Sequence, residues 1–168
     1  MPPESKHSVS QSSLAKDLAQ LLGEISKLRR SVTFCAALDY LMKSRGITND
    51  EMEERTGLCR DTISRYRSQP DKEPPLQTVT LFCLALHLEP ELSEEMIRLA
   101  GKGTRAVQCD ILCRKLLREK YTWQIDDIDA YLKSEGFKPI SKRHKLANST
   151  EKRRSYPTEG PCGGGSAV

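Results

Sequence analysis

The stretch from Thr48 to Ser68 constrains the fold more than any other part of the chain, because it holds two short helix patterns separated by one glycine. Thr48 and Glu51 fit a capping box, in which each side chain accepts a hydrogen bond from an unpaired backbone N–H group at the helix start. Gly57 then marks the end of the first helix, since only glycine adopts the left-handed conformation there without a steric penalty. The pattern predicts a helix, a tight turn and a second helix.

The second helix of this stretch is expected to have two different faces. Ile63 and Tyr66 fall on one face, and Leu58 precedes them in a position to fill the wedge between the helices. Polar side chains at this helical spacing suit reading of base edges in a DNA major groove. The candidate DNA-binding residues on the opposite face are Arg60, Asp61, Ser64, Arg65 and Ser68.

This stretch resembles the helix-turn-helix of the Cro and lambda-repressor-like (XRE-type) family. The resemblance implies an all-α protein with a five-helix DNA-binding domain, and a sequence-specific transcriptional regulator of double-stranded DNA. A repressor that acts by operator occupancy, bound as a homodimer, is the expected form. The residues that carry the resemblance are Met52, Gly57, Leu58 and Thr62-Ile63-Ser64-Arg65-Tyr66, followed by Pro74-Pro75-Leu76, within a span from Phe34 to Gly101.

Each polar residue of the second helix has an expected role. Arg60 and Arg65 are predicted to contact bases, because a guanidinium group can bridge two acceptors on a guanine. Asp61 is expected to accept from a cytosine or to fix an arginine, and the two serines to hydrogen-bond bases or phosphates. Arg67 is expected to contact a phosphate.

Composition favours a small core with much polar surface, since 37% of the 168 residues are hydrophobic and 30% are charged. No apolar run approaches the roughly 20 residues that span a bilayer. Residues 1–13 lack the apolar segment of a signal peptide, so we expect a cytoplasmic protein with no membrane contact. The six cysteines are then expected to be reduced thiols.

The net charge of +4 is concentrated at the C-terminal end. Residues 138–168 hold seven basic and two acidic residues, which gives +5, and residues 1–137 hold the other 20 basic and 21 acidic residues, which gives −1. Binding to DNA is therefore expected to depend on a local patch.

The N-terminal part divides into a leader and a helix. Residues 1–13 are rich in Ser and Pro and are expected to be disordered. Residues 14–32 form an amphipathic helix with apolar residues at alternating spacings of four and three, from Leu14 to Val32. This helix is interpreted either as a dimerisation helix or as an ordinary helix packed on its own domain.

Residues 33–101 make up the predicted helix-turn-helix domain. Its first helix carries Phe34. Its fourth helix runs from Leu76 to Leu88 and is apolar nearly all round, which is typical of a buried helix. Pro90 is expected to end that segment, and Ser93 is expected to cap the last helix, which closes at Gly101.

Residues 104–137 are expected to form a C-terminal helical hairpin. One helix is predicted over 106–120 and a second over 123–135, with Thr122 as its cap. The hairpin could extend the core, mediate dimerisation or bind a regulatory protein partner. The alternative function is therefore an antitoxin-like or adaptor module that uses these helices.

Residues 138–168 lack a hydrophobic period and end in a glycine-rich segment, so disorder is expected. The basic runs at 142–145 and 152–154 are interpreted either as a flexible arm along DNA phosphates or as a solvated tail.

Catalysis, cofactors and metals are not expected. The three histidines, His7, His87 and His144, have no nucleophile or carboxylate at motif spacing, and His87 is expected to cap a helix C-terminus. Cys109 and Cys113 lie four apart, but no second Cys/His pair has zinc-site spacing.

Overall fold

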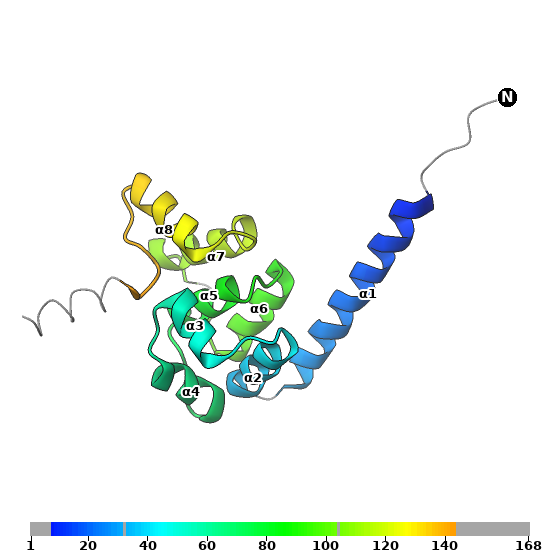
Figure 1. Ribbon diagram of the computed structural model, residues 1–168, viewed down its shortest axis with the longest axis horizontal. Coiled ribbons are helices and arrows are strands. Elements are labelled where there is room, and N and C mark those ends of the chain that lie inside the picture. Colours follow the sequence, from blue (N-terminus) through cyan, green and yellow to red (C-terminus); the bar gives the residue numbers. More distant parts are fainter. Residues whose placement is uncertain (1–7, 32, 104, 144–168) are drawn as a thin grey trace, which may run out of the picture.

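A computed structural model of the chain describes residues 8–31, 33–103 and 105–143, and these are arranged as helices connected by loops (Figure 1). The eight helices of the described part are α1 (Ser8–Arg30), α2 (Phe34–Ser44), α3 (Asn49–Thr56), α4 (Arg60–Ser68), α5 (Leu76–Ala85), α6 (Pro90–Leu99), α7 (Gln108–Glu119) and α8 (Ile125–Ser134).

Helix α5 lies at the centre of the body because it is apolar on every side. It is buried from Thr78 to Ala85 and packs against α3, α6, α7 and α8. Phe82 connects α5 to two further helices, since its ring lies 6.3 Å from the ring of Phe34 on α2 and 5.9 Å from the ring of Tyr66 on α4. The prediction of a buried helix is confirmed, although it ends at Ala85, three residues before the expected Leu88.

Helix α1 projects away from the body along most of its length (Figure 1). Its C-terminal end packs on α6, where Leu28 is fully buried and Arg29 forms a 2.9 Å ion pair with Glu95. The helix begins at Ser8, so residues 8–13 are helical where disorder was expected. Residues 1–7 and Val32 lie outside the described residues.

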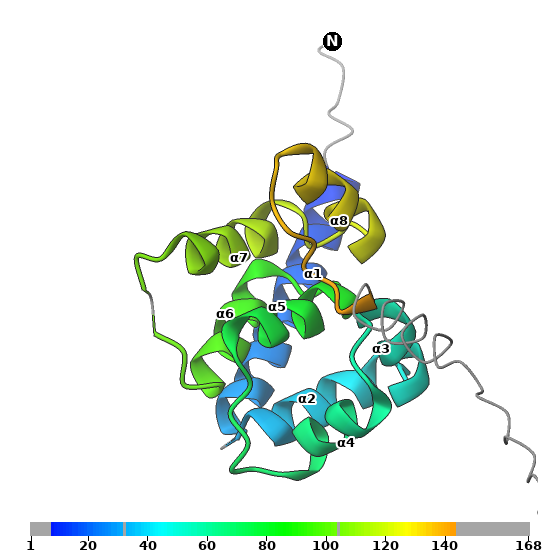
Figure 2. The ribbon, with the colours of Figure 1, turned by 90° about the vertical axis from the view of Figure 1, so that its left-hand side faces the viewer.

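Helices α7 and α8 follow one another over the residues where a hairpin was predicted, and both pack on α5 (Figure 2); we call this pair the hairpin. Both are shorter than expected, and Thr122 does not cap α8, which begins after Gln124 without a side-chain cap. Ser93 is likewise not a cap, because Pro90 begins α6 and Ser93 is buried within it. Proline suits the first turn of a helix, where its missing N–H group has no partner to lose.

The chain after α8 is the largest departure from the prediction. Residues 137–143, which we call the strap, cross from the hairpin to the end of α3, and they are ordered where a disordered tail was expected (Figure 2). Ile140 is buried, and the carboxylate of Asp129 accepts from the backbone N–H groups of Ile140 and Ser141.

The strap ends on the turn between α3 and α4. The Lys142 N–H group donates to the Thr56 carbonyl at 3.0 Å. The Arg143 guanidinium donates to the Arg55 carbonyl at 2.6 Å and to the carboxylate of Asp126. These carbonyls belong to the last turn of α3, which has no intrahelical donors left for them. The proposal that Lys142 and Arg143 lie along DNA phosphates therefore competes with contacts inside the protein.

Candidate nucleic-acid interface

The turn that presents α4 is built as the sequence predicts. The Thr48 hydroxyl accepts from the Glu51 N–H group at 3.2 Å, and the Glu51 carboxylate accepts from the Thr48 N–H group at 3.0 Å. Gly57 ends α3 with φ of 72° in the left-handed region. Leu58 is buried after it, so the wedge between the helices is filled.

The inner face of α4 fixes the helix to the body. Ile63 is fully buried, and Tyr66 packs edge-on against Phe82 with an interplanar angle of 81°. Helix α4 therefore cannot rotate about its axis without breaking these contacts. Cys59, just before the helix, makes no side-chain cap and its thiol contacts the Thr62 hydroxyl instead.

The outer face of α4 is exposed to solvent as predicted. Arg60, Asp61, Ser64, Arg65 and Ser68 are all exposed. Among the described residues, no ion pair or hydrogen bond engages the Arg65 guanidinium, and Arg60 makes only a 3.1 Å pair with Asp50. Both groups of that pair are about two-thirds exposed, so the pair contributes little and is easily exchanged for a ligand.

Arg67 is placed differently from the other candidates. Its guanidinium donates to the carboxylate of Asp39 at 2.5 Å and to the side-chain oxygen of Asn49 at 2.5 Å, and only 21% of the side chain is exposed. The Cys35 thiol donates to the backbone carbonyl of Arg67. These contacts join α4 to α2 and α3, which is a bracing role that the helical spacing of the residue does not reveal.

Formal charge on the helix-turn-helix is slightly negative. Residues 49–68 hold five acidic and four basic residues, which gives −1. Four of the acidic residues are on α3, and α4 carries three of the basic ones. Within this motif, the positive charge that could attract DNA lies on α4.

A family model supplies independent evidence for this motif. Residues 37–91 match the Cro/C1-type helix-turn-helix DNA-binding domain. The chain contains a Cro/C1-type domain. This confirms the family that the sequence resembles, and the matched span runs from α2 to the start of α6. No curated protein and no solved structure matches the chain.

Side chains that could bind a metal do not gather at one place within the described part of the chain. No group of three or more His, Cys, Asp or Glu side chains there could hold a metal ion. Burial raises the pKa of the Cys113 thiol to about 11, so this thiol stays protonated near neutral pH.

His87 adopts a positive φ of 49° just after α5, and its ring nitrogen Nδ1 contacts the Tyr121 carbonyl rather than the end of that helix. None of the described helices is long and apolar enough to cross a membrane.

Proposed function

We propose that this protein is a sequence-specific double-stranded DNA-binding transcriptional regulator, and that it represses by occupying its operator. The observation that carries the proposal is the division of α4 within a Cro/C1-type domain. Its inner face is fixed by Ile63 and Tyr66, while its outer face presents exposed polar groups, among which the Arg65 guanidinium has no partner in the described residues. A rigid helix with an exposed polar face is what major-groove reading requires.

The geometry ranks the candidate residues. Arg65 has no competing partner among the described residues, so we assign it the main base contact. We assign Arg60 the second base contact, because breaking its exposed ion pair with Asp50 costs little free energy. Asp61, Ser64 and Ser68 stay candidates. Arg67 would have to leave Asp39 to reach a phosphate, and we propose that it chiefly orients α4.

Selection of random duplex DNA by the full-length protein tests this proposal. A shared recovered sequence is expected, and Arg65→Ala should then lose about 1–3 kcal/mol of discrimination against altered sites. Lys115→Ala, an exposed substitution on α7, is the control and should leave both affinity and preference unchanged. Recovery of no common sequence by the wild-type protein would refute the proposal.

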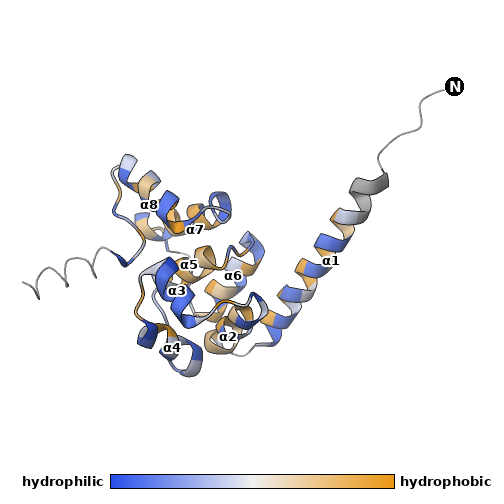
Figure 3. Ribbon diagram, viewed as in Figure 1, coloured by the Kyte–Doolittle hydropathy of each residue, from blue (hydrophilic) through white to orange (hydrophobic). Residues whose placement is uncertain are grey.

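We further propose that α1 joins two copies of the chain. Leu14, Leu18 and Leu22 are 59%, 51% and 63% exposed along the part of the helix that leaves the body (Figure 3). Their spacing of four residues puts them on neighbouring turns of one face, and side chains of this size cost free energy in water. A symmetric pair would present two recognition helices to half-sites about 34 Å apart.

Light scattering tests the dimer with a matched pair of variants. Leu14→Glu combined with Leu18→Glu adds two negative charges to the exposed apolar face and should yield a monomer. Lys16→Glu changes the charge by the same amount about 200° around the helix from Leu18 and should stay dimeric. Deleting residues 1–32 is a poorer test, since it removes the buried Leu28. A dimer in both variants would exclude α1 as the interface.

Residues 144–168 are proposed to strengthen binding without reading sequence. They follow Arg143, whose side chain bonds to the end of α3, and they contain four Lys or Arg residues. Deleting them should lower the salt dependence of binding, with the slope of log K against log salt falling by up to about 3–4. Deleting only residues 155–168, which hold no Lys or Arg, is the control. Equal slopes for the two deletions would mean that these cations stay in solvent.

A second function is supported by the hairpin. Val107 and Ile111, at the start of the hairpin, and Phe137, at the start of the strap, are 55%, 57% and 37% exposed, which suits an adaptor or antitoxin-like surface for a protein partner. Under that function the wild-type protein would bind a partner tightly and show only weak, salt-sensitive DNA binding. We place either function in the cytoplasm.

A further inference from the structure

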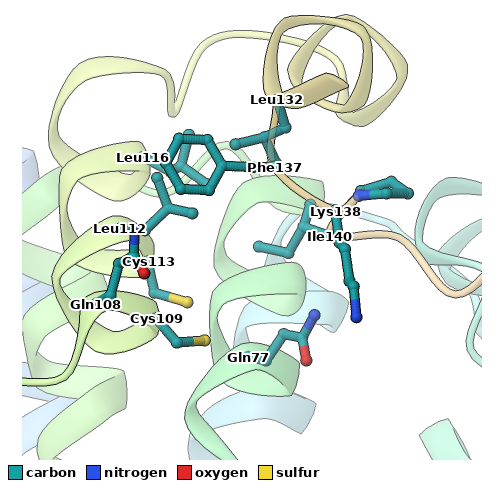
Figure 4. A pocket seen from close by; sticks show the side chains of 11 residues that line it. Gln77, Gln108, Cys109, Leu112, Cys113, Leu116, Leu132, Phe137, Lys138 and Ile140 are labelled. Atoms are coloured by element: carbon teal, nitrogen blue, oxygen red, sulfur yellow. The ribbon is translucent and has the colours of Figure 1, made fainter. Parts of the chain in front are cut away.

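A hollow of about 330 Å³ lies where the hairpin and the strap meet α5 (Figure 4). Its walls are mainly apolar, and a second hollow of about 260 Å³ along α7 shares several of the same side chains. The first volume is at the lower end of the range for small-molecule sites. The side chains that line it include Gln77, Leu112, Leu116, Leu132, Phe137 and Lys138.

One end of this hollow is polar. In the view of Figure 4, Gln77 and the ammonium group of Lys138 lie toward one end, and Leu116, Leu132 and Phe137 lie toward the other. The Lys142 ammonium donates to the Gln77 side-chain oxygen at 3.3 Å, which places a second cation beside that end. Within the described residues, Lys138 has no ion pair of its own.

We propose that this hollow is a binding site for a monocarboxylate with a medium-length hydrocarbon chain. The chain of such a molecule would bury against the leucines and Phe137, where removal of apolar surface from water drives binding. Its carboxylate would pair with Lys138 and accept from the Gln77 amide, which are charge-assisted contacts. A neutral apolar molecule would leave the cationic end without a partner.

The site is connected to the DNA-binding turn through the strap. Phe137 and Ile140 line the hollow, and two residues later Lys142 is bonded to the Thr56 carbonyl at the end of α3. A ligand in the hollow adds contacts to the strap while Lys142 is bonded to Thr56, so it stabilises this bonded position of the strap. The bound ligand therefore slows local opening of the strap at Lys142.

Calorimetric titration of the full chain with decanoate, kept below its micelle-forming concentration and without DNA, tests the site. Decanoate should bind, and decanol should bind more weakly. Lys138→Gln should weaken decanoate by up to about fivefold, since it removes a charged partner at an exposed position. Lys133→Gln, an exposed substitution on α8 outside the hollow, should bind as the wild type does. No heat with decanoate at two well-separated temperatures, or equal binding of decanoate and decanol, overturns the proposal.

A second variant and a second readout keep the test independent of folding and of DNA binding. Leu112→Trp fills the hollow and should abolish binding while keeping the helical circular dichroism spectrum. Hydrogen exchange at the Lys142 amide should slow with decanoate in the wild type and not in Leu112→Trp. Binding that leaves this amide unchanged overturns the connection to the strap. Neither assay uses DNA, so a failure here is distinct from a failure of the regulator function.

Discussion

A pair of glycine substitutions measures how much the contact between the strap and Gly57 contributes to the free energy of unfolding. Gly57 and Gly46 both have positive φ, 72° and 65°. An added Cβ at Gly46 would meet nothing within 4 Å, whereas at Gly57 it would lie 2.7 Å from Arg143 Cγ and 2.8 Å from the Lys142 carbonyl carbon. Gly46→Ala should therefore lower the free energy of unfolding by about 1–2 kcal/mol, which is the cost of holding an alanine in the left-handed backbone conformation.

Gly57→Ala carries the same cost and also displaces the strap. The lost contacts are the backbone hydrogen bond from Lys142 to Thr56 and the charged one from Arg143 to Arg55. A neutral hydrogen bond contributes about 1 kcal/mol and a charged one about 1.5–3 kcal/mol, and partial exposure of Arg143 reduces the second value. The free energy of unfolding should fall by about 2–3 kcal/mol more in Gly57→Ala than in Gly46→Ala.

Equilibrium urea unfolding of the full-length variants measures this difference. Combining Gly57→Ala with Arg143→Ala should cost less than the sum of the two changes, because both remove the same contact. Losses in Gly57→Ala and Gly46→Ala that agree within about 0.5 kcal/mol would refute the reasoning, since the strap would then contribute nothing at the turn.

Three further predictions concern α4 and its supports. Ile63→Ala should lower the free energy of unfolding by about 2–5 kcal/mol, and the exposed Ser64→Ala by less than about 0.5 kcal/mol, in the same urea assay. Arg67→Ala should cost about 1–3 kcal/mol because it leaves the Asp39 carboxylate without its guanidinium partner; a loss no larger than that of Ser64→Ala would remove the bracing role. The hydrogen bond from Lys43, together with Arg67, holds the pKa of Asp39 below its ordinary 3.8. The stability from Asp39 is therefore complete above pH 3.8 and is lost as pH falls toward the folded-state pKa, so Asp39→Asn should flatten the decline of Tm in acid.

The parts of the domain that follow local rules could be predicted from the sequence. The capping box at Thr48, the left-handed turn at Gly57 and the buried Ile63 each depend on residues within one or two helical turns. Such features leave a pattern that is readable without any knowledge of the tertiary contacts. The division of α4 into two faces follows from the same periodicity.

Helix starts were less predictable where two caps competed. Ser93 has the chemistry of a cap, but Pro90 three residues earlier has the right backbone angle for a first turn, and it begins α6. Thr122 failed for a related reason, since α8 starts at Ile125, where burial of that side chain in the hairpin decides the position. The first helix start is therefore decided by a competing local preference, and the second helix begins at a buried side chain.

The strap could not be predicted, because its contacts join it to residues far away in the sequence and half of them are made by backbone N–H groups. Ile140 is its one buried hydrophobic residue, and a single residue has no period. Its backbone N–H groups donate to the Asp129 carboxylate and the Thr56 carbonyl, partners 11 and 86 positions away in the sequence. The side chains of Lys142 and Arg143 also bond to distant partners, namely Gln77, Arg55 and Asp126. Backbone donors are the same for every residue type, so composition reveals only that the segment is polar and basic.

The same contacts change how charge on this protein should be interpreted. Counting from sequence assigns Arg67, Lys142 and Arg143 to DNA, yet each is engaged within the protein. On α4 this leaves Arg65 unengaged and Arg60 weakly paired, within a motif of formal charge −1. One copy of such a domain has few cations to release counterions, so its affinity for DNA should be low. Two copies joined through α1 would double those contacts on one operator, and the exposed leucines of α1 therefore bear on DNA binding as much as on assembly.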